Sequence, residues 1–456
     1  MAKSGFYGWK LIAAFWVIVF INLAFAAYGS PVMNAAMAQQ MHLSRTMAGL
    51  PYSLYIVMSA LPSAFIAVFV RRIGVRRTVM LGCLLILVGC VLMATVVHGA
   101  ISAALVFGVM IAFGVCAGGV FGTQPGVVLW FVRQRGLAIA LVYSGGAVGG
   151  LVAPLVLNKI IIAGGGNWRA GWWLYGALAV ISTVIAAVFI RDRPEDLGQV
   201  PYGSDPVPVA ALAQERGGAA EAAEQAAPAG RGDRRGAATK HKRPAFISDE
   251  RWTFAEVMRS GRFWIMVLAL CGGSAGYTLF LAQGVLHLKD LGFDSTQAAV
   301  ALSVTTGSAL LGKAPLALFG DRLDPRYIWA ITGAVFGLGL ILVIHPHTML
   351  EVYLFSICVG IGFGGGIVGM MTTLSNYYGA EVFAAAAGVG AALNTVVSFF
   401  ASNVGGVVYD RLGSYAPTFY ILAAWCFAGA IALAVVGQPQ RRAAVRPAAL
   451  PVGSGS

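Results

Sequence analysis

The sequence predicts an all-α membrane protein with twelve transmembrane helices in two six-helix bundles. The 456-residue chain is 58% hydrophobic and 11% charged, whereas a soluble domain carries about 25% charged residues. Its apolar runs are about 20 residues long, which suits a helix crossing the bilayer and is twice the length that a membrane β-strand needs. A polar stretch separates six such runs from six more, which predicts two halves.

The expected helices follow the apolar runs in chain order. In the first half they lie near residues 9–28, 47–70, 78–98, 101–122, 136–158 and 168–190, and in the second near 263–286, 297–319, 328–345, 351–373, 383–405 and 416–437. The stretch between them is rich in Ala, Gly, Pro and charges, which predicts a largely disordered cytoplasmic linker. The expected domains are therefore a bundle at 1–190, a linker at 191–262, a bundle at 263–437 and a cytoplasmic tail at 438–456.

Similar signals at matching positions predict a pseudo-symmetric repeat. VRRIGVRRT follows the second expected helix, with Arg72 and Arg76, and GDRLDPRY follows the eighth, with Asp321 and Arg322. The fifth and eleventh helices both carry Gly- and Ala-rich stripes, which allow helices to approach closely. Matching signals in two halves are typical of transporters built from a repeat.

The distribution of charge predicts orientation and excludes several function classes. The net charge of +13 comes from Lys and Arg clustered between the expected helices on one side, which predicts that both termini are cytoplasmic. We expect the membrane to be a plasma membrane, in particular a bacterial inner membrane. Charge distributed in this way does not indicate nucleic-acid binding. Six cysteines are scattered singly in apolar runs, a spacing that suits packing rather than a metal site. We find no nucleotide loop, nucleophile arrangement or metal-ligand cluster, so we expect no enzyme activity and no cofactor.

Residues 298–324 contain the charge on which the functional prediction depends. Between residues 298 and 319 the only formal charge is Lys313, about 12 Å along the helix axis from Asp321. That depth lies within the apolar half-thickness of ~15 Å, where a charge costs at least ~2.5–3.5 kcal/mol. The lysine can snorkel to the interface, form a structural ion pair, or face a central cavity and bind an anion. The last is favoured, because the interiors of the other expected helices offer no Asp or Glu.

Further polar and aromatic side chains within the expected helices are candidates for the same cavity. Hydroxyls and amides can donate to a carboxylate, and aromatic rings can wall a cavity. For each of them, interhelical hydrogen bonding, interface anchoring or packing is the alternative. These candidate substrate-binding residues are Tyr28, Gln124, Tyr143, Tyr277, Gln283, Phe121 and Phe363.

Four stretches resemble one family of membrane proteins. They are FYGWK at residues 6–10, WFVRQRGLAIALVYSGGAVGG at 130–150, RDRPEDLG at 191–198 and WTFAEVMRSGRFW at 252–264. In this order and spacing, the chain resembles the major facilitator superfamily, and within it the monocarboxylate transporter and oxalate:formate antiporter branch. The resemblance covers nearly all of the chain except the linker core and the tail, and it implies secondary active transport by alternating access.

The chain departs from this branch at residues that bear on proton coupling and on the choice of substrate. The resemblance places Lys313 where the branch carries a basic residue, and Ala309 where the animal carriers hold an Asp one turn earlier. The antiporter's second basic residue has no counterpart in the eleventh helix, where the nearest polar group is Asn394. One cation suits one carboxylate, so the resemblance favours a monocarboxylate over oxalate.

The family's inner-loop motif, which holds gating ion pairs, is also altered. The positions that normally read Gly, Asp and Arg are Ala67, Arg71 and Arg72 in the first half, so the acidic member is missing. In the second half Asp321 and Arg322 are present, but Asp324 replaces the usual glycine. We therefore expect weaker gating ion pairs on the first-half side.

The sequence thus predicts a monomeric secondary transporter of small carboxylates, most simply monocarboxylates with protons. An organic-anion exchanger of the oxalate/formate type is the main alternative. A multidrug exporter is a further one, which an acidic residue inside the first-half helices would favour; none is present there. A receptor or scaffold would need a soluble output domain, which the low-complexity linker does not supply.

Overall fold

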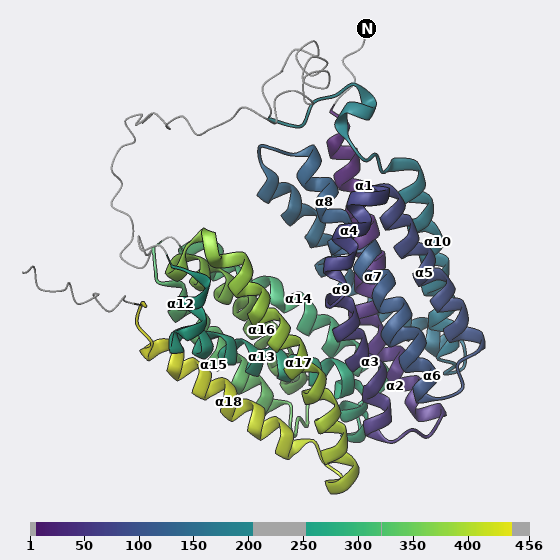
Figure 1. The fold of residues 1–456 in the computed structure, drawn as a ribbon. Helices are drawn as coiled ribbons and strands as arrows, with labels where there is room; N and C mark the ends of the chain where they lie inside the picture. Colours follow the sequence, from purple (N-terminus) through teal and green to yellow (C-terminus); the bar gives the residue numbers. More distant parts are fainter. Residues whose placement is uncertain (1–5, 204–251, 321, 440–456) are drawn as a thin grey trace, which may run out of the picture. The chain divides into compact units, whose positions relative to one another are not determined.

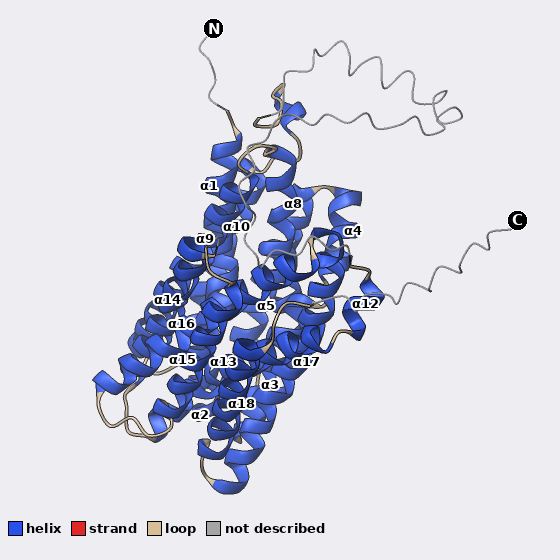
Figure 2. Cartoon of the chain, turned by 90° about the vertical axis from the view of Figure 1, so that its left-hand side faces the viewer, coloured by secondary structure: helices blue, strands red, loops and turns tan. Residues whose placement is uncertain are grey.

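The structure, a computed structural model, describes residues 6–203, 252–320 and 322–439. These residues form helices and no strand (Figure 2), and one isolated β-bridge joins Phe131 to Tyr202. Contacts divide the chain into two units, of which the first comprises Met1–Arg243 and Leu281–Thr306. The second comprises Pro244–Phe280 and Gly307–Ser456. The predicted all-helical membrane class is confirmed.

The first unit contains two long helical segments in which a π-helical stretch interrupts the α-helix. Its elements are α1 (Gly8–Ala24), the π-helix η1 (Phe25–Gly29), α2 (Ser30–Gln40), α3 (Arg45–Ala60), α4 (Ser63–Ile73), α5 (Val75–Thr95), α6 (Ala100–Ala103), the π-helix η2 (Ala104–Ile111), α7 (Ala112–Gly118), α8 (Val120–Trp130), α9 (Arg135–Ala163), α10 (Arg169–Phe189) and the 3-10 turn η3 (Pro194–Leu197) (Figure 1). Residues 8–40 run continuously through η1, whereas the axis bends by 52° between α3 and α4. Pro51 lies inside α3, and Pro62 immediately precedes α4.

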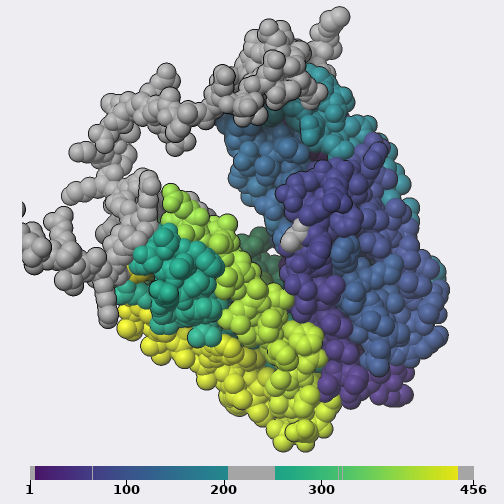
Figure 3. All heavy atoms as spheres, in the orientation of Figure 1, coloured from purple at the N-terminus to yellow at the C-terminus, as the bar shows by residue number. Residues whose placement is uncertain are grey.

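The second unit contains longer and more regular helices. They are α12 (Phe254–Arg259), α13 (Gly261–Asp290), α14 (Ser295–Phe319), α15 (Pro325–Leu342), α16 (Met349–Tyr378), α17 (Ala380–Leu412) and α18 (Ala416–Val435). The hairpin between α13 and α14, Leu281–Thr306, belongs to the first unit, so each of these two helices passes from one unit into the other. The least buried of the long helices is α17, which forms much of the front surface of the second unit (Figure 3).

Among the described residues, ten helical segments are long and apolar enough to cross a membrane, and the bent α3–α4 pair makes an eleventh. The remaining expected span corresponds to α14, whose 25 residues cover about 37 Å. α14 is not among the segments counted above, and it contains Lys313 and several hydroxyl residues. The count of twelve spans therefore remains a prediction.

The expected linker is ordered at both of its flanks. On the first side, Gln199 Oε1 accepts a hydrogen bond from the Tyr7 backbone N–H at 2.9 Å, and Tyr202 packs on the Phe131 ring at 5.7 Å between centroids. On the second, α12 begins with a capping box in which Thr253 and Glu256 bond each other's backbone N–H. The linker core at 204–251 and the tail from 440 lie outside the described residues, so the expected domain boundaries remain predictions.

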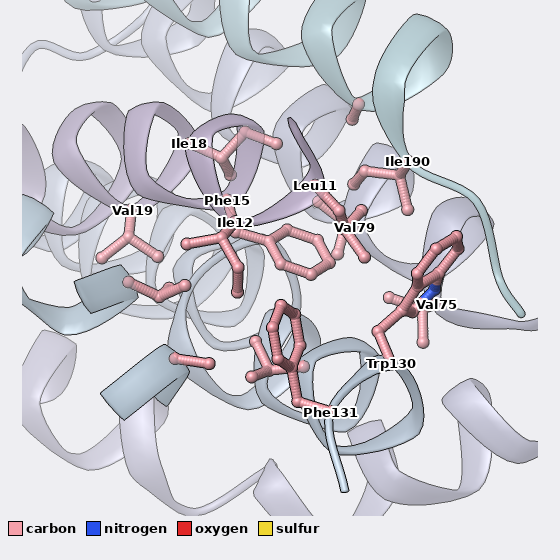
Figure 4. Close-up of a cluster of buried hydrophobic side chains, with 14 of the residues drawn as sticks. Leu11, Ile12, Phe15, Ile18, Val19, Val75, Val79, Trp130, Phe131 and Ile190 are labelled. Carbon is pink, nitrogen blue, oxygen red and sulfur yellow. The ribbon is translucent and has the colours of Figure 1, made fainter. Parts of the chain in front are cut away.

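An apolar cluster joins the ends of α1, α5, α8 and α10 in the first unit (Figure 4). Phe15, Val79, Trp130 and Ile190 are completely buried within it. The Trp130 ring also satisfies its polar atom, because its Nε1–H donates to the Arg191 carbonyl at 3.2 Å. The cluster therefore fixes the chain leaving α10 against the start of α1.

A buried polar node centred on Asn22 links α1 to α5, α7 and α10. The Asn22 Nδ2 donates to the Gly118 carbonyl at 2.8 Å and to Cys83 Sγ at 3.2 Å, while Oδ1 accepts from Ser182 Oγ at 3.0 Å. The Tyr175 hydroxyl donates to the Asn22 carbonyl at 2.9 Å. Since lipid offers no competing water, a satisfied network of this kind both stabilises and orients the helices.

We predict that Asn22→Ala destabilises the first unit by about 2–4 kcal/mol, because it creates a cavity and removes the partner of the Gly118 carbonyl and one of the two partners of the Ser182 hydroxyl. Thermal unfolding of the detergent-solubilised protein measures the change. Asn403→Ala is the matched control, since the Asn403 amide donates only to Phe399 one turn earlier in its own helix. Equal melting temperatures for the two variants would contradict a linking role for Asn22.

Candidate functional site

Lys313 lies in α14, six residues before the helix ends at Phe319 and therefore about 9 Å from that end along the axis. Its side chain is exposed. Within the described part of the chain, its ammonium has no hydrogen-bond or ion-pair partner. A lysine at this depth of an apolar helix has three donors for an anion and no internal carboxylate that occupies them.

Backbone contact between α14 and α16 holds Lys313 in place. A side chain at Gly312 would collide with the Ile361 carbonyl oxygen, and one at Gly364 would collide with the Ala309 carbonyl oxygen. The two helices can approach this closely only because both residues lack a Cβ. Lys313 follows Gly312 directly, so its side chain leaves α14 about 100° around the axis from this contact.

Two aromatic candidates meet at the same level of the second unit. Tyr277 of α13 and Phe363 of α16 stack face to face, with ring centroids 3.6 Å apart and planes inclined by 6°. Phe363 lies between the two positions at which α16 contacts α14, residues 361 and 364. The structure therefore brings Tyr277 and Phe363 together, next to the part of α16 that contacts α14 near Lys313. Substrate binding by these three residues stays a prediction.

Asn394 lies on a fourth helix of this unit, α17, and is half-buried. Its Oδ1 is buried, and no hydrogen-bond partner is found for it among the described residues. A buried amide oxygen without a partner is rare, because the lost hydration costs about 1–3 kcal/mol. Asn394 remains a candidate for a ligand or a proton-bearing group.

In the first unit, Tyr28 lies in the π-helix η1, a helical irregularity that is common at functional sites. A Cβ added to Gly150 of α9 would lie 2.9 Å from the Tyr28 ring and 3.1 Å from Thr306 Cβ. The Thr306 hydroxyl donates to the Gly150 carbonyl at 2.7 Å. Tyr143 lies two turns before Gly150, on the same face of α9, and is 39% exposed.

The other first-unit candidates differ in how far their polar groups are engaged. Phe121 and Gln124 lie three residues apart on one face of α8, and Phe121 is 40% exposed while Gln124 is half-buried. Gln283 is buried, and its Nε2 donates to the Arg45 carbonyl at 2.8 Å. One of its donors therefore already supports the start of α3. Substrate binding by these residues stays a prediction.

A set of polar contacts, which we call the hairpin contacts, ties the α13–α14 turn to α2, α3 and α9 within the first unit. Arg45 binds both oxygens of Asp290, at 2.6 and 2.8 Å. Lys289 Nζ donates to Gln39 Oε1 at 2.6 Å, and Asn158 Nδ2 donates to Thr296 Oγ1 at 3.2 Å. The sequence analysis did not predict these contacts. The only sign of them in the sequence is the charged residues next to two expected helices, Arg45 before the second and Lys289 and Asp290 after the seventh.

The inner-loop motif has the same arrangement in both halves. Arg76 and Arg326 are each the second residue of a helix, α5 and α15. The backbone N–H of Arg76 donates to Asp192 at 2.8 Å and its guanidinium donates to the Ala187 carbonyl at the end of α10. The backbone N–H of Arg326 donates to Asp324 at 3.1 Å and its guanidinium donates to the Val436 carbonyl after α18.

The acidic partners of this motif were not those expected from the sequence. The carboxylate at the start of α5 comes from Asp192, after α10, rather than from the motif position that reads Arg71. In the second half Asp324 pairs with Arg326 at 3.2 Å and accepts a hydrogen bond from the Tyr377 hydroxyl at 2.8 Å. Arg72 and Arg322 are exposed, and Asp321 lies outside the described residues, so a gating role for these three stays a prediction.

Comparison with known proteins identifies transporters throughout. Monocarboxylate transporter 14 of Mus musculus is 28% identical over 218 residues, 46% of this chain and 40% of that protein. Monocarboxylate transporter 13 of Bos taurus is 25% identical over 175 residues, 38% of this chain and 41% of that protein. The alignments thus span about two fifths of these relatives. The uncharacterized MFS-type transporter YhjX of Escherichia coli is 20% identical over 362 residues, 78% of this chain and 77% of that protein.

Solved structures share the fold at low sequence identity. The nucleoside transporter NupG superposes with a TM-score of 0.68 and 13% identity, covering 93% of this chain and 98% of NupG. A bacterial homologue of the human lysosomal transporter Spinster gives 0.64 and 15%, covering 95% and 96%. The family model of the Major Facilitator Superfamily matches residues 15–402 and 283–452, most of the chain. This chain is therefore a multi-pass membrane transporter, not an enzyme, and belongs to the Major Facilitator Superfamily.

Proposed function

We propose that the protein is a secondary active transporter that moves small monocarboxylates together with protons across a bacterial inner membrane by alternating access, with both termini in the cytoplasm. The observation that carries this proposal is the unpaired ammonium of Lys313 inside an apolar helix. The low-identity relatives that are named monocarboxylate transporters support the substrate class. The chain is expected to act as a monomer without a cofactor.

Lys313 is the proposed anchor of the substrate carboxylate. An ammonium and a carboxylate in an apolar surrounding form a charge-assisted hydrogen bond, which is about twice as strong as a neutral one. The stacked rings of Tyr277 and Phe363 offer an apolar wall for the rest of a small substrate. A single cation neutralises one carboxylate, so a dicarboxylate such as oxalate would retain an uncompensated charge there.

We propose proton coupling because one ammonium and one carboxylate together carry no net charge. Ala309 stands one turn before Lys313, where an acidic side chain would otherwise pair with the lysine. A substrate that arrives with a proton gives a neutral ammonium–carboxylate pair, which crosses the apolar midplane without the cost of a lone charge. After substrate release, Lys313 gives its proton to the cytoplasm and the empty carrier returns uncharged.

Two other functions use the same residues differently. In an organic-anion exchanger of the oxalate/formate type, Lys313 stays charged and the carrier returns only with a counter-anion. A multidrug exporter would need an acidic group for cationic substrates, and no Asp or Glu lies in the described helices between residues 8 and 189. The first of these alternatives is the one that transport measurements have to separate from symport.

We predict that Lys313→Ala lowers carboxylate uptake on the order of 100-fold, because it removes a charged hydrogen bond worth up to ~3 kcal/mol. Lys313→Arg should retain measurable uptake with altered selectivity, since the guanidinium keeps the charge but changes the geometry. Lys159→Ala is the control, a lysine exposed on α9 outside the site. The measurement is the uptake of a labelled monocarboxylate into proteoliposomes. Near-normal uptake by Lys313→Ala would refute the role of Lys313 as the carboxylate anchor.

We predict net uptake into empty proteoliposomes under an inward pH gradient, with acidification of the lumen that matches substrate entry mole for mole. A panel of labelled C1–C6 carboxylates and an internal pH dye measure both. Lys313→Ala vesicles serve as the background. Uptake that requires preloading with a counter-anion, without proton movement, would establish exchange instead.

We further propose that the hairpin contacts close one end of the transport path, so that they must break and re-form in each cycle. Arg45→Asp or Asp290→Arg then places like charges together and should lower the uptake rate at least fivefold, since a partly exposed pair is worth about 1 kcal/mol. The double exchange Arg45→Asp/Asp290→Arg restores the pair and should recover most of the rate. Failure of the double variant to exceed either single variant would show that the pair does not act as a gate.

A further inference from the structure

A basic pocket lies in the first unit, remote in sequence from Lys313, where α4 ends and α5 begins. It has a volume of about 730 Å³ and is closed on one side by the C-terminal part of α8. α4 and α8 are in contact, and both can be found in Figure 1. Four arginines line the pocket, Arg71, Arg76, Arg77 and Arg193, against one carboxylate, Asp192.

The charges of this pocket are not balanced within the described residues. Asp192 is engaged by the backbone N–H of Arg76, and the Arg76 guanidinium donates to the Ala187 carbonyl. The guanidinium groups of Arg71, Arg77 and Arg193 are exposed and have no hydrogen-bond or ion-pair partner in the described part of the chain. Three guanidinium groups without a described partner therefore line one cavity, and the single carboxylate of Asp192 balances at most one of the four positive charges there.

The remaining wall of the pocket is apolar and continues into an apolar surface. Val70, Ile73 and Leu129 line it. Phe65 and Phe69 of the adjacent α4 are 67% and 39% exposed. A ligand with an anionic head and apolar tails matches this combination, whereas a free ion would use only the arginines.

We propose that this pocket binds an anionic phospholipid whose headgroup carries two phosphates. Guanidinium forks bind phosphate oxygens in pairs, and basic pockets at the cytoplasmic ends of membrane helices are typical sites for such headgroups. Three unpaired arginines exceed what one phosphodiester neutralises, and the volume accommodates more than a single phosphate group. The site concerns a lipid ligand and is independent of the carboxylate transport proposed above.

Native mass spectrometry of the full chain in detergent, titrated with diphosphatidylglycerol, tests the proposal. Arg71→Gln/Arg77→Gln should weaken binding about 30-fold, because each basic residue near anionic lipid contributes roughly a factor of five. Arg76 is left intact, since it joins α5 to α10. The control Arg72→Gln/Arg133→Gln removes the same charge from arginines outside the pocket lining and should leave the affinity nearly unchanged.

Three results would overturn the assignment. Equal losses in the two double variants would mean that the lipid responds to overall charge and not to the pocket. Displacement of the lipid by inorganic phosphate at similar concentration would assign the site to a free anion. Equal affinity for zwitterionic phosphatidylethanolamine would remove the requirement for a doubly anionic head. Circular dichroism and the elution volume in size-exclusion chromatography, if unchanged in each variant, show that the binding was measured on folded protein.

Discussion

The constraint on which this structure depends is that polar groups in an apolar bilayer must find their partners inside the protein. Asn22 meets it completely, because its amide and carbonyl groups bond with groups on three other helices. The starts of α5 and α15 meet it with carboxylates that accept the backbone N–H of the second residue of each helix. Lys313 is the contrasting case, a cation in the long and mostly apolar helix α14 without a described partner. Buried polar atoms without a partner among the described residues occur elsewhere, Asn34 and Asn394 among them, but Lys313 carries a formal charge, which is why we propose it as the place for an anionic ligand.

The two halves reach the same local chemistry with residues from different places in the sequence. Arg76 and Arg326 occupy equivalent helix positions, and each donates to the carbonyl end of the last helix of its half. Their carboxylate partners are not equivalent, since Asp192 follows the sixth span whereas Asp324 immediately precedes the ninth. The physical requirement, a negative charge at a helix N-terminus beside an arginine, has been kept although the residue that supplies it differs.

The sequence was sufficient to predict the helical membrane class and the family, because these depend on the length of the apolar runs and on short motifs. The expected bundle boundaries and the depth of Lys313 in the membrane stay predictions. It proposed Tyr277 and Phe363 as candidates, but could not show that they stack on each other, since aromatic residues in apolar runs carry no information about their partners. Asp192 and the pair Arg45–Asp290 were missed for a similar reason. Their partners lie 116 and 245 residues away in the chain, and no local periodicity records such a contact.

The continuity of α14 across the boundary between the units has a mechanical consequence. The helix runs from Ser295 to Phe319 with Pro315 inside it; its first part, up to Thr306, belongs to one unit and its remainder to the other, and no proline lies between Thr306 and Lys313. Lys313 lies seven residues beyond Thr306, about 10.5 Å along this helix and on nearly the same face. A tilt of the helix about Thr306 therefore displaces the cation in proportion to that lever arm, and a tilt of 20° moves its Cα by roughly 3.5 Å. Force applied at the hairpin would in this way reach Lys313 through one helical segment, without any intermediate chain of side-chain rearrangements.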